Sequence, residues 1–225
     1  MNTELKSWAE ETVNYLHAVA TDKDNPEMDL SFYAFRTEPK INPNVVFLGI
    51  NPGEHDYSYA DLYKNPIWGL EKEGRMTPER FIKADPSIED LDKWKIWIEL
   101  QKSFGNIDFF KDYIFMNLIY FNTKKVEDLF SRKNGLEVYR KNIEFTTKLL
   151  VDIIKPKYIV CLGTKDCFDR LVIEEEVLLK TTKRLVVTGF LGDIKVFGIP
   201  HPSGSYTSNE HKKEIGKVIL RNMKC

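Results

Sequence analysis

Short apolar runs alternate along the chain with longer segments in which apolar residues recur at helical spacing. Four runs of β-branched and aromatic residues, bounded by Gly, Pro or Asn, predict strands at 45–50, 113–120, 158–162 and 194–199. Such nearly continuous runs are typical of strands covered on both faces. A fifth run, 184–190, is followed by Leu191-Gly192-Asp193 and predicts a hairpin with the last strand, at a sheet edge.

The segments between these runs have helical patterns. They predict helices at 5–20, 92–104, 136–154, 164–171 and 209–223. Alternation of strands and helices is typical of a parallel sheet with helices packed on its faces. We therefore expect an α/β fold, a three-layer α/β/α sandwich around a central, mainly parallel sheet of about four strands.

The length and composition fit a single globular domain. The chain has 225 residues, of which 42% are hydrophobic and 30% charged, and no low-complexity tract or linker divides it. We therefore expect one domain over 1–225. The stretch 54–91 has no clear period and is long for a connection, which is typical of a functional or flexible loop.

Several classes of protein do not fit the sequence. The N-terminal residues resemble neither a signal peptide nor a transit peptide, and no apolar run is long enough to span a bilayer. Three cysteines without a C-x-x-C pair indicate neither a disulfide framework nor a metal site. We expect a cytoplasmic monomer that does not bind membranes and needs no metal or cofactor.

The charge is close to balanced but unevenly distributed. The net charge is −1, which gives no overall attraction for a polyanion. The segment 54–92 has ten acidic and five basic residues, whereas 201–225 has two acidic and five basic ones. Any phosphate-binding face is therefore expected at the C-terminal end of the chain.

Polar residues follow each predicted strand. In open α/β sheets, ligands bind outside the carboxyl ends of the strands, so these residues are the candidates for a site. They are Asn51, Asn117, Asn122, Gly163-Thr164 and His201-Pro202-Ser203-Gly204.

Two of these loops are stiff. In Gly49-Ile50-Asn51-Pro52-Gly53, Pro52 fixes φ and Gly53 permits a positive φ, so the Asn51 side chain is held beyond the sheet. By itself, Asn-Pro-Gly is more often a structural turn. His201 lies between an apolar strand and a second proline, which places its ring at the mouth of the sheet and favours a functional role.

Taken together, the two loops resemble the motifs of the uracil-DNA glycosylase superfamily. Its first motif reads G-I-N-P-G or G-M-N-P-G in the mismatch-specific and single-strand-selective branches, and its second reads H-P-S or N-P-S. Asn117 falls where the superfamily has a strand-end Asn, and 158–163 resembles its third core strand. Pro66-Ile67-Trp68-Gly69 resembles the segment that brings an aromatic ring onto the flipped base, although Tyr57 or Tyr59 are alternatives for that ring.

The resemblance implies hydrolysis of the N-glycosidic bond of uracil, or of a related deaminated base, in single-stranded or mismatched DNA during base excision repair. Asn51 would hold the attacking water, His201 would stabilise charge on uracil O2, and Asn117 would read O4 and N3–H. Substrate contacts would come from Gly49, Ile50, Pro52, Gly53, Trp68, Asn117 and Ser203. DNA contacts would come from Gly204, Ser205, Tyr206 and Lys212, with Tyr206 as the only bulky residue available to enter the stack. The iron-sulfur branches are excluded because no cysteine precedes Cys161.

Two alternatives stay open. The first is a glycosylase-like fold that binds nucleotides or nucleic acids without cleavage, which the near-neutral charge favours. The second is an unrelated α/β hydrolase or transferase that uses His201 with Ser203 or a cysteine. The sequence lacks the G-x-S-x-G, P-loop and G-x-G-x-x-G motifs, which argues against the second alternative.

Overall fold

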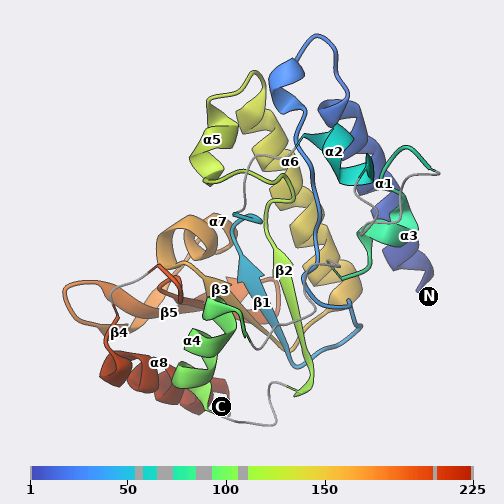
Figure 1. Cartoon of the computed structure of the whole chain (residues 1–225). Coiled ribbons are helices and arrows are strands. Elements are labelled where there is room, and N and C mark those ends of the chain that lie inside the picture. Colours follow the sequence, from blue (N-terminus) through green and yellow to red (C-terminus); the bar gives the residue numbers. More distant parts are fainter. Residues whose placement is uncertain are drawn as a thin grey trace. The chain divides into compact units, whose positions relative to one another are not determined.

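The apolar runs of the sequence form the inner strands of a mixed sheet in the computed structural model (Figure 1). The structure describes residues 2–53, 58–64, 73–84, 93–105, 111–204 and 207–223. The strands are β1 (Val45–Gly49), β2 (Tyr113–Asn117), β3 (Tyr158–Leu162), β4 (Glu176–Lys180), β5 (Arg184–Leu191) and β6 (Ile194–Ile199). The α-helices are α1 (Thr3–Ala20), α2 (Tyr59–Lys64), α3 (Pro78–Phe81), α4 (Lys95–Phe104), α5 (Val126–Phe130), α6 (Gly135–Lys148), α7 (Asp169–Leu171) and α8 (Asn209–Met223). A 3₁₀ turn, η1 (Pro26–Met28), and two π-helical segments, η6 (Leu149–Ile154) and η7 (Thr164–Phe168), complete the described elements.

The contacts of the chain divide it into two compact units. Unit 1 consists of Met1–Pro39, Asn51–Ile88 and Met116–Ile153, and unit 2 of Lys40–Ile50, Glu89–Phe115 and Ile154–Cys225. Unit 2 contains the sheet, except that β2 continues into unit 1 at its last two residues, and unit 1 contains α1, α2, α3, α5 and α6. One domain over 1–225 stays a prediction.

The sheet has the strand order β2-β1-β3-β6-β5-β4. β3 pairs in parallel with β1 on one side and with β6 on the other, and these three strands are almost entirely buried. β5 pairs antiparallel with β6, with Leu191 opposite Ile194, so the predicted hairpin and its tight turn at Gly192-Asp193 are confirmed. The carboxyl ends of β1, β3 and β6 therefore lie at the same edge of the sheet.

Two details of the predicted sheet are wrong. The sheet has six strands and is mixed, whereas about four mainly parallel strands were predicted. β5 is not at the edge, because β4 pairs with it on the outer side. β4 was missed because its residues are exposed or only half-buried, so the sequence lacks the continuous apolar run of an inner strand.

The core of unit 2 joins the sheet to two packed helices. Residues of α4 and α8, including Leu100, Phe104 and Ile219, lie in one buried cluster with Phe47 and Phe197 of the sheet. α4 and α8 also pack directly against each other (Figure 1). Gly216 permits this approach, because a Cβ at that position would lie 1.8 Å from the carbonyl oxygen of Ser103.

Aromatic side chains dominate the core of unit 1. Trp8 of α1 stacks on Phe81 with ring centroids 5.6 Å apart, and its indole N–H donates to the carbonyl of Phe145 on α6. A buried segment, 31–36, runs antiparallel to 116–122, with isolated bridges from Phe32 to Phe121 and from Phe35 to Met116. These contacts fix the positions of Arg36 in the first segment and Asn117 in the second.

The predicted helices are present, with changes at several ends: α1 begins two residues earlier than predicted and α4 three residues later. α8 has the predicted bounds, whereas 136–154 is α-helical only to Lys148 and continues as the π-helical η6. The predicted helix at 164–171 begins with the π-helical η7. Within the described part of the chain, no helix is both long and apolar enough to cross a membrane.

Candidate functional site

The loop after β1 holds Asn51 by its amide nitrogen. Gly49 is the last, buried residue of β1, Ile50 is half-buried, and the chain then turns through Gly53, whose φ is 72°. The Nδ2 of Asn51 donates to the main-chain carbonyl of Thr123 at 2.6 Å and to its hydroxyl oxygen at 3.0 Å. Asn51 is thus fixed by contacts within unit 1.

These contacts set the orientation of the Asn51 amide. A main-chain carbonyl can only accept a hydrogen bond, so the atom that faces it must be the amide nitrogen and not the oxygen. The Oδ1 of Asn51 is therefore directed away from Thr123, and none of the described residues donates to it. A water molecule can donate to this oxygen, as the predicted role of Asn51 requires.

A buried arginine braces the same loop. Arg36 is 4% exposed, and its Nη2 donates to the carbonyl of Pro52, itself a buried residue, at 3.0 Å. The guanidinium lies 4.5 Å from the centre of the Tyr33 ring, a cation–π contact. Arg36 thus limits the movement of the peptide that follows Asn51.

Asn117 is a buried amide with an unused donor. It is the last residue of β2 and only 2% exposed, and its main-chain N–H donates to the carbonyl of Ala34 at 2.9 Å. Its side-chain Nδ2 has no hydrogen-bond partner among the described residues. A buried donor without a partner costs on the order of 1–3 kcal/mol, which makes Nδ2 of Asn117 a candidate donor to an external acceptor.

His201 lies in unit 2, two residues after the end of β6, in a turn closed by the main-chain N–H of Gly204, which donates to the His201 carbonyl. Its ring is half-buried, and its Nδ1 lies 3.2 Å from the Oγ of Ser203. When the Ser203 hydroxyl donates to Nδ1, the ring proton is on Nε2, which is then a donor for a ligand.

The surroundings of His201 favour the neutral ring. Burial lowers the pKa of His201 below its usual value of 6.5, and the carboxylate of Asp166 on η7 opposes this effect without overcoming it. The imidazole is therefore neutral at pH 7 and acts as a hydrogen-bond donor, not as a cation.

The residues predicted to contact DNA have different surroundings. Lys212 of α8 is half-buried and forms an ion pair with Glu99 of α4, a carboxylate that also pairs with Lys102. The ammonium of Lys212 is thus engaged within unit 2, although one carboxylate is shared by two lysines. Its neighbour Lys213 is exposed. Ser205 and Tyr206 lie outside the described residues, so their DNA contacts stay predictions.

Of the three candidates for a ring that stacks on the base, only Tyr59 is described. Tyr59 is 1% exposed, stacks on Phe32 at 5.0 Å, and accepts a hydrogen bond from the main-chain N–H of Met76. Its ring thus belongs to the core of unit 1. Trp68 and Tyr57 lie outside the described residues.

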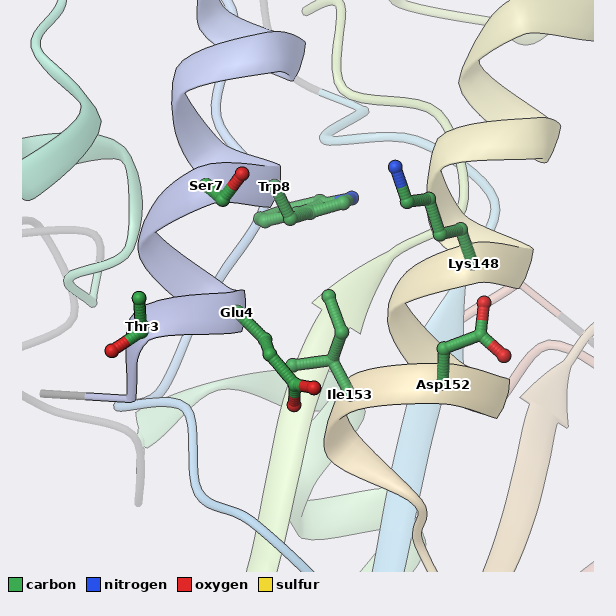
Figure 2. Close-up of a pocket in the computed structure, with 7 residues that line it drawn as sticks. All are labelled: Thr3, Glu4, Ser7, Trp8, Lys148, Asp152 and Ile153. Carbon is green, nitrogen blue, oxygen red and sulfur yellow. The ribbon is translucent and has the colours of Figure 1, made fainter.

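A pocket of about 330 Å³ lies elsewhere in unit 1, between the first turns of α1 and the end of α6 with η6 (Figure 2). Thr3, Glu4, Ser7, Trp8, Lys148, Asp152 and Ile153 line it. The Lys148 ammonium pairs with Glu11 at 2.7 Å. None of the predicted site residues lines this pocket.

The sequence predicted Asn51, Asn117, Ser203 and His201 as site residues, and these roles stay predictions. It did not indicate the residues that hold the loop of Asn51. Thr123 and Arg36 contact residues that are 72 and 16 positions away in the chain, and no local pattern signals such contacts. The sequence held one signal for Arg36, since this charged residue directly follows the apolar run 32–35.

Comparison with known proteins leaves the family open. Neither the protein-family models nor the curated proteins include a match to this chain. Among the described residues, no group of three or more His, Cys, Asp or Glu side chains is placed to hold a metal ion.

Proposed function

We propose that this protein is a monofunctional DNA glycosylase of the uracil-DNA glycosylase type, which hydrolyses the N-glycosidic bond of uracil or a related deaminated base. The observation that carries the proposal is the buried Asn117 amide with its unpartnered Nδ2. Uracil presents an acceptor at O4 and a donor at N3, which match the donor and acceptor of one amide. Cytosine presents the opposite pattern on this edge, so the amide rejects it.

The proposed reaction uses one residue from each stiff loop. The Oδ1 of Asn51 accepts a hydrogen bond from the attacking water, and Nε2 of the neutral His201 donates to O2 as negative charge develops on the departing base. β1 and β6 flank β3 and run in the same direction, so both loops leave the sheet at the same edge. An amide is a weak base, which suits a reaction whose cationic sugar needs little activation of the water.

The test is cleavage of labelled oligonucleotides, single-stranded and duplex, that contain uracil, hypoxanthine or xanthine, with alkali treatment to break the abasic strand. Asn51→Ala and His201→Ala are compared with wild type and with Asn42→Ala and His211→Ala, which change the same residue types outside the site. We expect scission by wild type and both controls and its loss in both site variants. Absence of scission from every lesion by folded wild type contradicts the proposal.

The same experiment distinguishes the alternative of binding without cleavage. In that case DNA binding persists and weakens with increasing salt, but no abasic product forms. The unpaired Asn117 donor serves either function, whereas a pure binding protein has no evident use for a neutral His201 together with an Asn51 oxygen turned away from Thr123.

A further inference from the structure

One edge of the sheet has no further strand among the described residues. β4 ends the strand order, and within the described part of the chain it pairs with β5 alone. No main-chain hydrogen bond of β4 to any other described segment is present. Alternate N–H and C=O groups of an edge strand point outward, where they can pair with another strand.

Apolar side chains are exposed at this end of the sheet. Ile173, just before β4, is fully exposed, Val177 of β4 is 41% exposed, and Phe190 of β5 is 61% exposed. The segment that contains Ile173 passes close to β5, because a Cβ on Gly189 would lie 2.3 Å from the side chain of Val172. Val177 and Phe190 are on opposite faces of the sheet, because Val177 pairs with Val187 and Phe190 lies three residues beyond Val187 on β5. Val177 is therefore the exposed apolar side chain on the edge strand itself that a further strand would help to cover.

The charges on β4 have a two-fold pattern. The strand reads Glu-Val-Leu-Leu-Lys, with Glu176 and Lys180 placed symmetrically about Leu178. In an antiparallel pair centred on Leu178, Glu176 lies opposite Lys180 of the second copy, and Lys180 lies opposite the second Glu176. Glu176 and Lys180 are on one face of the sheet, because they pair with Thr188 and Arg184, which are four residues apart on β5.

Neither charge is satisfied within the described part of the chain. Glu176 and Lys180 are exposed and form no ion pair there, whereas neighbouring Arg184 is paired with Asp169 and Glu175. Directly opposite side chains in an antiparallel pair are close enough to form ion pairs. Charged residues on an edge strand usually prevent it from pairing with another strand. With Glu176 and Lys180 in these positions, pairing is prevented only with strands that do not place an opposite charge across from each of them.

We propose that β4 pairs antiparallel with β4 of a second copy of this chain, which joins the two six-stranded sheets into one. The backbone edge of β4 provides the hydrogen bonds, the exposed Val177 provides apolar area to bury, and the two Glu176–Lys180 pairs fix the register. The expectation of a monomer is then replaced by a two-fold dimer. The short strand and irregular β4–β5 register limit the contact, so we expect a reversible dimer.

Sedimentation velocity from about 1 μM to about 1 mM tests the proposal over the range of reversible dimers. The mass of wild type should rise with concentration from 26.3 kDa toward twice that value. Glu176→Lys and Lys180→Glu should each remain monomeric, with at least tenfold weaker association, because each places like charges opposite each other. A 1:1 mixture of the two variants should associate like wild type, since every opposing pair is then complementary.

The double exchange Glu176→Lys/Lys180→Glu should also restore the dimer, and Glu10→Lys on α1 is the control for net charge. All of these positions are exposed, so circular dichroism should show unchanged thermal unfolding. Wild type that stays at 26.3 kDa at every concentration overturns the proposal. Single variants that dimerise like wild type, or a mixture that fails to associate, overturn the proposed register and with it the proposal.

Discussion

Replacing Asn51 by aspartate tests the orientation of this amide. Asn51→Asp keeps the size of the side chain but removes the N–H groups that face Thr123. An ionised carboxylate would place an acceptor against the Thr123 carbonyl, to which Nδ2 now donates at 2.6 Å. The Thr123 hydroxyl, 3.0 Å from Nδ2, can rotate to donate to the carboxylate, so part of the loss is recovered.

The expected loss in free energy of unfolding follows from the hydrogen bonds that Asn51→Asp removes. Loss of a hydrogen bond that leaves its partner unsatisfied costs about 1–3 kcal/mol, and the half-buried loop offers little water to compensate. Protonation of the introduced carboxyl restores a donor toward the carbonyl, so its pKa should lie well above the usual aspartate value of about 3.9. A raised folded-state pKa means that the folded state binds more protons than the unfolded state. The variant should therefore lose stability as pH rises from about 4 through the folded-state pKa.

The assay is urea unfolding of wild type, Asn51→Asp and the exposed control Asn42→Asp at pH values from about 4 to 8, a range that covers the carboxyl titration. We expect Asn51→Asp to be close to wild type at the acid end and about 1–3 kcal/mol less stable at pH 8. The control should follow wild type throughout. If Asn51→Asp is as stable as wild type at pH 8, the amide nitrogen does not face Thr123, and the assignment of Oδ1 to the water is wrong.

Two further predictions concern His201 and the helix pair of unit 2. Because burial lowers the pKa of His201, the unfolded state binds more protons below pH 6.5, so stability should fall as pH drops from 6.5 toward the folded-state pKa. His201→Gln should flatten this slope in urea titrations, while an unchanged slope would show that the ring is not buried in its neutral form. Gly216→Ala should destabilise by about 3 kcal/mol or more, since its Cβ would lie 1.8 Å from the Ser103 carbonyl oxygen. Gly204→Ala, where the nearest atom would be 3.7 Å away, should change the free energy of unfolding by less than about 0.5 kcal/mol, and similar values for the two variants would contradict the packing argument.

The inner strands were predictable because burial on both faces leaves a continuous apolar run. β3 and β6 have the predicted bounds, and β1 differs by one residue. The run at 113–120 is longer than β2, because residues after Asn117 are buried in the core of unit 1 beside 31–36. An apolar sequence predicts that residues are buried, but not whether a sheet or another part of the core buries them. The end of β2 could therefore not be predicted from the sequence.

The sequence could point to candidate site residues but not to the residues that hold them in place. Asn51 and His201 each come two residues after the end of an apolar strand and just before a proline, which is a local signal. Thr123 and Arg36 act through contacts that only the folded chain creates. The Lys212–Glu99 pair shows the same limit, because the sequence identifies a lysine as a cation but does not show whether its ammonium pairs with a carboxylate in the fold.

The central claim is that the buried Asn117 amide recognises a base that the protein removes. The most direct measurement is single-turnover release of free uracil from a single-stranded oligonucleotide by wild type and Asn117→Ala, with unfolding curves to confirm that both are folded. We predict that wild type releases uracil and that Asn117→Ala is slower by about 10²–10³-fold, the usual effect of removing a preorganised hydrogen-bond donor from an active site. No uracil release by wild type, or equal rates for the two proteins, would contradict the account.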